Sequence, residues 1–380
     1  MRRRMLPLAT LTGLSVAVIL VYPPTGALAD AAAEAGPRGC VVSGDYETCL
    51  TDPEQVSNGH DTAIEDRLRQ LTQSAGSGDV IRISEYTWTR PELARDLVAA
   101  KDRGVDVKVV LDGINKHDHN GGYTTLTDGG IPLTSCSHGS SCLGTHFSHN
   151  KLFLFDIGGV KQVAVTSTNL TTAQMALPNN MLKVSGDDKL YAFFLGYWNR
   201  LNAQSWTYDG DTWDDDDKVA AGSKSTYGYA YPRHSDNVLT VLNKVKECSG
   251  SHNRIMVAAA LFTKPRVAIR DRLAALQDKL GCDVQVIVGD RDTESWVQAA
   301  NSSGDLRNGK VSIFNSHNKL IMIDAKYGDE WQRAVWSGSH NLSGTSLRTN
   351  DETLAYVNDP RVEGRYAEYF DAMMARATGT

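Results

Sequence analysis

The apolar and polar positions of this chain follow one order of elements twice. In the first copy, an alternating strand at Val80–Ile83 precedes the turn Thr89–Pro91 and an amphipathic helix that ends at Gly104. The apolar strand Val105–Leu111 comes next. Proline near the start of the helix, glycine at its end and apolar strands on either side are typical of a βαβ unit with parallel strands.

The second copy has the same elements in the same order. The strand Ile255–Ala260 is followed by the turn Thr263–Pro265, a helix that ends at Gly281, and the strand Val284–Val288. Because 380 residues are more than one core usually serves, the repeat predicts two domains. We predict an α/β fold of two duplicated α-β-α sandwich domains, with mixed sheets and pseudo-twofold symmetry.

The repeat, and the composition between its copies, predict the domain boundaries. We predict a signal peptide at 1–29, an N-terminal extension at 30–57, a first domain at 58–207, a linker at 208–235 and a second domain at 236–380. The linker contains the acidic run Asp214–Asp217, for which a solvated segment is favoured over a calcium site. Helices are expected at Asn58–Ala75 and Arg361–Ala377.

The first residues are typical of a secretory signal. Arg2–Arg4 form a basic region, Met5–Val21 an apolar one, and Ala27–Ala29 a small-residue cleavage site. A retained anchor is the alternative, but no later segment has the roughly 18 uninterrupted apolar residues of a membrane span. Cleavage would remove three arginines and no acids, which changes the formal net charge from −6 to −9. This charge disfavours nucleic acid as the main partner.

Six cysteines in an exported chain favour disulfides over a metal site. Proximity along the chain suggests the pairs Cys40–Cys49, Cys136–Cys142 and Cys248–Cys282, although other pairings are open. The alternative is a zinc site with the ligands Cys136, His138, Cys142 and His146, whose spacings differ from those usual for zinc.

The sequence Ser-His-Asn-Lys-Leu occurs at Ser148–Leu152 and again at Ser316–Leu320. Each copy continues into an apolar run that ends in an aspartate, Asp156 or Asp324. Side chains at i and i+2 of a strand lie on one face, so the histidine and lysine of each copy are expected to point the same way. A titratable imidazole and a fixed cation, present twice, indicate two half-sites that share one anionic group.

A second strand follows each motif and ends in small polar residues. These stretches are Thr166–Leu170 and Ser337–Leu342, which contain Asn169 and Asn341. Amide donors, hydroxyls and accessible backbone N–H groups can surround an anion. Two histidines, two lysines and two asparagines around one axis suit a phosphodiester, and would stabilise a pentacovalent transition state without a metal or cofactor.

The pattern H-x-K-x4-D followed by G-S-x-N, twice in one chain, resembles the phospholipase D superfamily over Val80–Met374. The resemblance implies that one histidine attacks phosphorus to give a phosphohistidine. The other protonates the leaving alcohol and then activates water or an acceptor alcohol. It implies His149 as the nucleophile and His317 as the acid and base. The residues implied to bind phosphoryl oxygens are Lys151, Lys319, Asn169, Asn341, Ser339 and Ser167, with Asp156 and Asp324 as structural charges.

The family usually supplies a downstream carboxylate that orients each imidazole. Glu352 fits this place in the second half, with Asp351 as the alternative. The equivalent position in the first half is Asn180, an amide that would orient His149 while stabilising its imidazolium less than a carboxylate. This difference suits a nucleophile that must be neutral, although the opposite assignment of the two histidines stays open. The first half also has Thr-Ser-Thr where Gly-Ser is usual, so the role of Ser167 is less defined.

Weaker candidates lie near the ends of predicted strands. His117 follows the strand Val105–Leu111, at an edge where α/β sheets tend to form sites, and either contacts substrate or faces solvent. His146 and His340 flank the motifs as supporting or surface groups. The aromatic residues that form either core or an apolar wall for acyl chains are Tyr86, Trp88, Phe262 and Trp296.

These observations predict a secreted, metal-independent phospholipase D-type enzyme. It would hydrolyse glycerophospholipids to phosphatidic acid and the head-group alcohol, and transfer the phosphatidyl group to other alcohols. We expect a monomer without cofactor that contacts membrane surfaces transiently to reach a phospholipid or another phosphodiester. The alternatives are an inactive member, a non-catalytic phosphate- or lipid-binding protein, or a secreted endonuclease. The basic groove of such an endonuclease would contain Arg90, Lys264, Arg266 and Arg348.

Overall fold

The computed structural model describes residues 38–52, 60–118, 121–205, 218–298, 306 and 310–377. The predicted signal peptide and the acidic run Asp214–Asp217 lie outside these residues, and so does the side chain of His117. None of the described helices combines the length and apolar character that a bilayer span requires.

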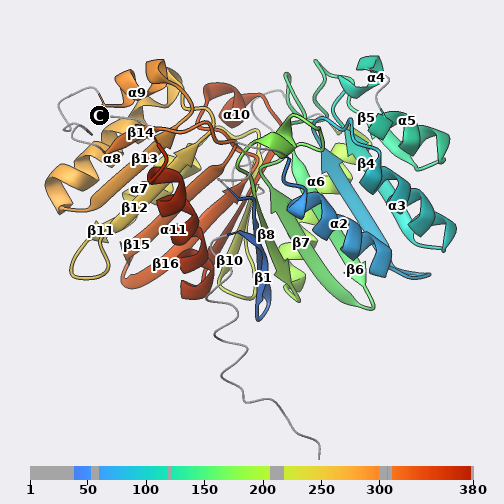
Figure 1. The fold of residues 1–380 in the computed structure, drawn as a ribbon, viewed down its shortest axis with the longest axis horizontal. Helices are drawn as coiled ribbons and strands as arrows, with labels where there is room; N and C mark the ends of the chain where they lie inside the picture. Colours follow the sequence, from blue (N-terminus) through green and yellow to red (C-terminus); the bar gives the residue numbers. More distant parts are fainter. Residues whose placement is uncertain are drawn as a thin grey trace, which may run out of the picture. The chain divides into compact units, whose positions relative to one another are not determined.

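In the described part of the chain, the first sheet has eight strands in the order β1-β2-β8-β7-β6-β3-β4-β5 (Figure 1). Their bounds are Gly39–Ser43 for β1, Tyr46–Leu50 for β2, Val80–Glu85 for β3, Asp106–Leu111 for β4, Leu133–Ser135 for β5, Lys151–Ile157 for β6, Val160–Thr166 for β7 and Asn180–Ser185 for β8. β3, β4 and β5 are parallel, whereas β6 is antiparallel to β3 and β7. β3 and β4 are the two strands of the first predicted βαβ unit.

The second sheet repeats this arrangement in the order β14-β13-β12-β15-β16-β17-β10-β9, with β11 paired to β15. The bounds are Val219–Ala221 for β9, Thr226–Tyr231 for β10, Val245–Glu247 for β11, Arg254–Ala259 for β12, Asp283–Val288 for β13, Val311–Ile313 for β14, Lys319–Tyr327 for β15, Glu330–Gly338 for β16 and Glu352–Asn358 for β17. β12, β13 and β14 are parallel, and β15 is antiparallel to β12. Both sheets are mixed, which confirms the predicted duplicated α/β fold.

Helices cover both faces of each sheet and divide the apolar interior into three clusters. The bounds are Ala63–Ser74 for α2, Glu92–Asp102 for α3, Asn115–Asp118 for α4, Gly121–Asp128 for α5, Asp188–Ala203 for α6, Asn237–Asn243 for α7, Val267–Leu280 for α8, Arg291–Gln298 for α9, Gly344–Arg348 for α10 and Pro360–Met374 for α11. α2 and α3 pack on one face of the first sheet, and α7 and α8 on one face of the second.

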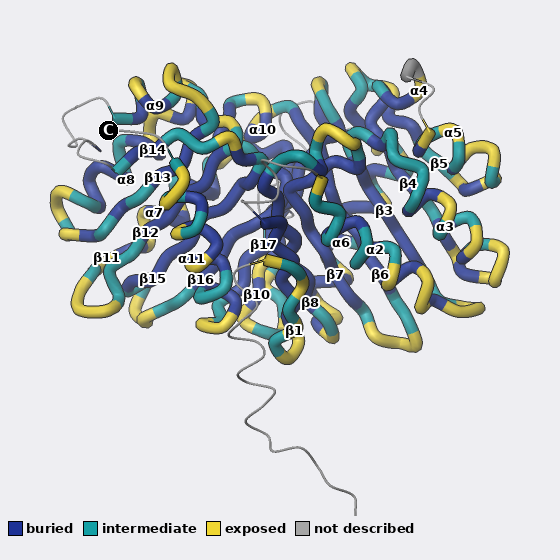
Figure 2. Tube along the Cα trace, viewed as in Figure 1, coloured by how far each residue is buried: buried dark blue, intermediate teal, exposed yellow. Residues whose placement is uncertain are grey.

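α6 and α11 lie where the two halves meet. Phe194 of α6 and Phe370 of α11 join residues of both sheets in one apolar cluster. Figure 2 shows that the strands are buried along most of their length, while exposed residues gather at turns and on the outer surfaces of helices. The shared cluster holds the halves together, so a site can be built from both.

Segments predicted as an extension and a linker contribute strands. β1 and β2 form a hairpin within 30–57 that joins β8 at the edge of the first sheet. β9 and β10 lie within 208–235, and β10 pairs with β17 in the second sheet. We propose domain boundaries that assign each of these strands to the sheet that it joins.

All three predicted disulfides are present, at Cys40–Cys49, Cys136–Cys142 and Cys248–Cys282. The described residues contain two clusters of three potential metal ligands, and each includes a disulfide-bonded cysteine pair together with Glu47 or Asp351. Disulfide sulfurs are not the thiolates that zinc binds. The cysteines of the 136–142 loop therefore act as a covalent bridge.

Candidate active site

The two motif histidines come just before the central strands of the sheets. β6 begins at Lys151 and β15 at Lys319, so only the lysine of each motif lies in the strand. The prediction that the strand includes the histidine is wrong by two residues. Nζ of each lysine donates to the backbone oxygen of its own histidine, at 3.0 Å from His149 and 2.7 Å from His317. Each lysine is thereby held beside its histidine.

His149 is oriented by a carboxylate from the other half of the chain. Its Nδ1 lies 2.9 Å from Oε2 of Glu352, the first residue of β17. Ser339 Oγ donates to the same carboxylate oxygen at 2.5 Å, and Asn350 Nδ2 donates to the other at 3.1 Å. Burial raises the pKa of Glu352, but His149, Lys151 and Ser339 outweigh it and lower that pKa overall. An ionised Glu352 fixes the proton of His149 on Nδ1 and leaves Nε2 with a lone pair.

His317 is oriented by neutral oxygens from the first half. Its Nδ1 lies 2.7 Å from the backbone oxygen of Ser167 and 3.2 Å from Oδ1 of Asn179. The amide of Asn179 is fixed in this orientation, because its Nδ2 donates to the backbone oxygens of Gln174 and Leu177. Both acceptors favour a proton on Nδ1 of His317. The two histidines therefore have unlike partners, a carboxylate and an amide.

The backbone shows which residues of the two halves are equivalent. The N–H of His149 donates to the backbone oxygen of Asp351, and that of His317 donates to the backbone oxygen of Pro178. The residue after Asp351 is Glu352, and the residue after Pro178 is Asn179. Glu352 and Asn179 are thus the matching positions, and each serves the histidine of the opposite half.

The prediction that Asn180 orients His149 is therefore wrong in two respects. The orienting residues cross between halves, and the equivalent amide is Asn179. Asn180 instead donates to Oδ1 of Asn318 at 2.6 Å and accepts from Ser337 Oγ and Tyr366 Oη. It joins the two sheets behind the histidines.

Burial dominates the pKa values of the basic groups. Desolvation is the largest cause that lowers the pKa of His149, to about 4; Glu352 opposes the shift, and Lys151 and Lys319 contribute to it. Desolvation also lowers the pKa of His317 well below its usual value, with Lys319, Lys151 and His149 adding to the effect. Both imidazoles are neutral at pH 7 without substrate. Burial lowers the pKa of Lys151 only to about 8, so Lys151 stays charged.

Two buried carboxyl groups accompany Lys151 in the first half. Glu85 pairs with Lys151 between β3 and β6, and burial raises the pKa of Glu85 to about 8. Asp112 accepts from the backbone N–H groups of Ser148 and Ile114, and burial raises its pKa to about 7. Neither residue was predicted from the sequence, although each lies at the carboxyl end of a parallel strand.

The second half has no matching carboxyl groups. In strand register, the partner of Lys319 is Ala259, whereas the partner of Lys151 is Glu85. Likewise, the residue after β13 is Gly289, whereas the residue after β4 is Asp112. Burial and the charge of Lys151 lower the pKa of Lys319 well below its usual value. Lys319 therefore has fewer carboxyl groups beside it to offset its positive charge than Lys151 has.

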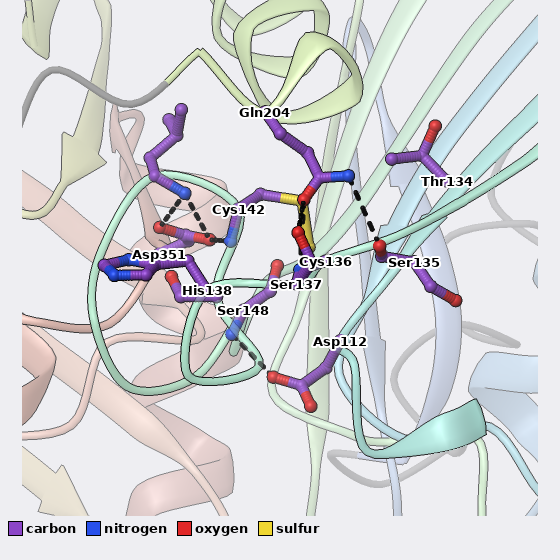
Figure 3. Close-up of a disulfide and its surroundings, with 12 residues drawn as sticks. Asp112, Thr134, Ser135, Cys136, Ser137, His138, Cys142, Ser148, Gln204 and Asp351 are labelled. Atoms are coloured by element: carbon purple, nitrogen blue, oxygen red, sulfur yellow. Dashed lines mark hydrogen bonds between the residues drawn. A yellow bond between two sulfur atoms is a disulfide. The ribbon is translucent and has the colours of Figure 1, made fainter. Parts of the chain in front are cut away.

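Asp351 anchors the disulfide loop of the first half to the second half. Its carboxylate accepts from the backbone N–H groups of Cys142, Leu143 and Gly144 at 2.7–3.2 Å (Figure 3). The loop is closed by the bridge to Cys136. The described Nδ1 partners of the two motif histidines are Glu352, Ser167 and Asn179, so Asp351 acts by positioning the residue beside it, Glu352.

Asn169 and Asn341 were predicted to bind phosphoryl oxygens. The side-chain oxygen of each is buried and has no hydrogen-bond partner among the described residues. Ser167 Oγ donates to Asn179 Oδ1 at 2.8 Å, as Ser339 does to Glu352. The hydroxyls of Ser167 and Ser339 thus support the orienting residues.

The motif aspartates lie toward the far ends of β6 and β15. Asp156 is paired with Lys161 in β7, and Asp324 contacts His252 at 2.5 Å and Arg333 at 3.7 Å. Neither position touches an imidazole of the motifs. His117 lies in the short helix α4, and its side chain is outside the described residues.

The aromatic residues that were predicted to form either core or an apolar wall lie partly at the site and partly in the core. The Tyr86 ring lies 4.9 Å from the His149 ring and 5.3 Å from Nζ of Lys151, so Tyr86 lines the site. Trp88 and Phe262 are buried in the apolar clusters, where they are core residues. Trp296 packs edge-on against Phe262 at 5.0 Å.

The flanking histidines also differ from each other. The His146 ring lies 3.9 Å from the Phe147 ring between centroids, with the two ring planes tilted by 44°. His340 is buried, stacks on Tyr231 at 3.9 Å and contacts Arg266 through Nε2. The surface alternative is therefore wrong for His340.

The duplicated fold, in which the histidine of each His-x-Lys segment is oriented by the opposite half, is that of the phospholipase D superfamily. A family model described as "Cardiolipin synthase, PLD-like domain" matches residues 68–201 and 245–374, and the chain belongs to this family. Members of the superfamily are phosphodiesterases or phospholipid-modifying enzymes. A search of the curated proteins gave no match.

Two of the matching solved structures, each with a TM-score above 0.5, share the fold. The phosphatidylserine synthase of Haemophilus influenzae Rd KW20 is 13% identical over 93% of this chain and 91% of that chain, with a TM-score of 0.59. The polyphosphate kinase of Porphyromonas gingivalis is 13% identical over 86% of this chain and 50% of that chain, with a TM-score of 0.57. Nuc, a phospholipase D family member from Salmonella typhimurium, is 26% identical over 42% of this chain and 94% of its own, with a TM-score of 0.33.

Proposed function

We propose that the protein is a secreted phospholipase D-type phosphodiesterase that hydrolyses glycerophospholipids to phosphatidic acid and the head-group alcohol. The observation that carries the reaction type is the contact of His149 Nδ1 with Glu352, made across the two halves. This contact presents a neutral Nε2 beside two buried lysines, which is what attack on a phosphodiester anion requires.

The first step forms a phosphohistidine. The bound phosphodiester anion raises the pKa of His317, which takes up a proton on Nε2. The Nε2 lone pair of His149 then attacks phosphorus, the bond from phosphorus to the head-group oxygen breaks, and His317 gives its Nε2 proton to that oxygen. Positive charge appears on the His149 ring as the new bond forms, and the Glu352 carboxylate stabilises it. His149 is the better nucleophile because a carboxylate accepts from its Nδ1, whereas the acceptors at Nδ1 of His317 are neutral.

The second step releases the enzyme. His317, now neutral, takes a proton from water, the water oxygen attacks phosphorus, and the bond to His149 Nε2 breaks. The products are phosphatidic acid and free enzyme, with the proton returned to His317. An alcohol in place of water gives transphosphatidylation by the same proton transfers.

The phosphoryl oxygens would be bound by the lysines and the two asparagines. Each lysine uses one of its three N–H donors on a histidine carbonyl and keeps two for substrate. Because these cations are already desolvated and fixed, little reorganisation is needed as the charge of the transition state develops.

Two observations favour a phospholipid over nucleic acid. Two of the four residues proposed for a basic groove, Arg90 and Arg266, form partly buried ion pairs with Glu65 and Asp236 and are therefore less available to a polyanion. Leu261 and Val267, 43% and 40% exposed, follow the carboxyl end of β12, close to the Asn341 segment. Exposed apolar side chains at this edge suit transient contact with a membrane surface.

The test is a parallel incubation of the purified protein, with EDTA, against mixed phospholipid vesicles and plasmid DNA. Choline or ethanolamine release with intact plasmid supports the proposal. Nicked plasmid with intact lipid would instead support the endonuclease, and phosphate binding without turnover on either substrate would support a binding protein.

A further inference from the structure

A cavity apart from the motif histidines lies in the second half, between helix α7 and one face of strands β10, β16 and β17. Its volume is about 290 Å³, near the lower end of small-molecule pockets. Its lining includes none of the motif histidines, lysines or asparagines. Along β17, Tyr356 in this lining is four residues from Glu352, roughly 13 Å at the rise of a strand.

Aromatic rings form the walls of the cavity. Tyr227 packs against Tyr356 at 5.7 Å between centroids, and Tyr356 packs against Trp336 at 4.6 Å. Tyr327 continues the wall, 5.7 Å from Trp336. Tyr227 is 41% exposed, so one end of the wall reaches solvent. Flat apolar walls of this kind bind a planar ring system well.

The cavity lining includes two cations, Arg233 and Lys244, and two buried donors. Arg233 Nε and Asn237 Nδ2 are buried and have no hydrogen-bond partner among the described residues. Lys244 Nζ lies 5.8 Å from the centre of the Tyr327 ring at the rim. None of the described lining residues is acidic. Buried donors without acceptors are costly unless something else accepts from them.

We infer that this cavity binds a small organic anion, a planar aromatic ring that carries a carboxylate. The ring would lie against Tyr356 and Trp336, and the carboxylate would accept from Arg233 and Asn237. Lys244 would complement its charge at the rim. A quaternary ammonium ligand also prefers aromatic walls, but the two cations here would repel it.

The cavity touches the active site through one buried tyrosine. Tyr231 Oη donates to Asn237 Oδ1 at 2.6 Å, and the Tyr231 ring stacks on His340, next to Ser339. The inference concerns binding alone and stands whether or not the protein hydrolyses phospholipids.

The test is isothermal titration of the full mature chain with 2-naphthoate, a probe without phosphate. We expect saturable one-to-one binding that inorganic phosphate does not displace and that the His149→Ala variant retains. Lys244→Met should weaken binding by about tenfold, because it removes the rim charge. Tyr227→Ala should weaken it as well, through loss of wall area. Lys246→Met, a matched change of an exposed lysine in β11, should leave binding unchanged.

Several results would overturn the inference. These are absence of binding to the folded protein, unchanged affinity in both the Lys244→Met and Tyr227→Ala variants, and displacement by inorganic phosphate, which would place the probe at the motif histidines. Tighter binding of tetramethylammonium than of 2-naphthoate would also overturn it. Thermal melting of each variant shows that the measurements are made on folded protein.

Discussion

Nδ1 of His149 lies 2.9 Å from Oε2 of Glu352, a residue that the other half of the chain supplies. The reverse contact runs from His317 to Ser167 and Asn179 of the first half. Each histidine is therefore carried by one half and oriented by the other. Neither half on its own contains an oriented histidine, so the shared apolar cluster around α6 and α11 is a condition for activity.

Replacing Glu352 with glutamine is expected to lower kcat by about 10²–10⁴-fold with a smaller change in KM. The amide cannot stabilise the positive charge that develops on His149. Steady-state kinetics on a soluble phosphodiester measure the effect. Glu330→Gln, at an exposed position of β16, is the control and should keep wild-type rates. A Glu352→Gln enzyme with normal kcat would contradict the proposed role.

The two histidines should differ in covalent labelling. With a phosphodiester whose leaving group is 4-nitrophenol, departure needs little help from an acid, so His317→Ala should still form the phosphohistidine. Its breakdown needs a base, so the labelled enzyme should accumulate. His149→Ala should show no label. Mass spectrometry of the quenched protein locates the phosphoryl group, and a label on His317 in the His149→Ala enzyme would reverse the assignment.

The fold and the central residues could be predicted because they repeat. The βαβ order, the His-x-Lys pairs and the asparagines occur twice in the same order, and proximity along the chain suggested the three disulfide pairs. Which half orients which histidine could not be predicted, since contact between residues 203 positions apart leaves no periodic signal.

The prediction of Asn180 as the orienting amide was wrong because the spacing after the asparagine differs between the two halves. Ten residues separate Asn169 from Asn179, whereas eleven separate Asn341 from Glu352, so equal spacing selects the wrong amide. Glu85 was not predicted because its counterpart in the second half, Ala259, has no ionisable side chain, so the repeat gave no signal at this position.

Binding of an inorganic anion should be coupled to proton uptake. Burial and neighbouring cations lower the pKa of His317 well below its usual value, and a bound phosphate would raise it. At pH 7 phosphate binding should therefore be coupled to net proton uptake, and the uptake should be smaller in His317→Ala. Affinity should fall as pH rises through about 8, where Lys151 loses its charge. Calorimetry in buffers of different ionisation enthalpy measures the uptake, and a value of zero at pH 7 would refute this account.

The disulfide loop should matter for activity as well as stability. Replacing Cys136 and Cys142 with serine is expected to lower the free energy of unfolding by about 2 kcal/mol, from the entropy of the short loop. Because Asp351 holds this loop beside Glu352, kcat should also fall, measured below the melting temperature. The same change at Cys40 and Cys49, in the edge hairpin, should lower stability similarly and leave kcat unchanged. Equal kinetic effects of the two double variants would show that the loop does not position Glu352.

Because Asn179 is the counterpart of Glu352, a change to aspartate at Asn179 should differ in effect from the same change at the neighbouring Asn180. In Asn179→Asp, a carboxylate would face Nδ1 of His317 and raise its pKa by about 1 unit or more. Since His317 acts as an acid in the first step, the alkaline limb of the kcat profile should move to higher pH. In Asn180→Asp, the new carboxylate would face Asn318, Ser337 and Tyr366 without a cation.

Burial should raise the folded-state pKa of that aspartate above its unfolded value. The Asn180→Asp variant should therefore be destabilised by about 3 kcal/mol at neutral pH, and more strongly as pH rises through the folded pKa. Chemical denaturation between pH 5 and pH 8, together with pH–rate profiles, separates the two outcomes. If Asn180→Asp shifted the rate profile and Asn179→Asp only lost stability, the pairing of His317 with Asn179 would be wrong, since a carboxylate raises an imidazole pKa only where the two groups are close.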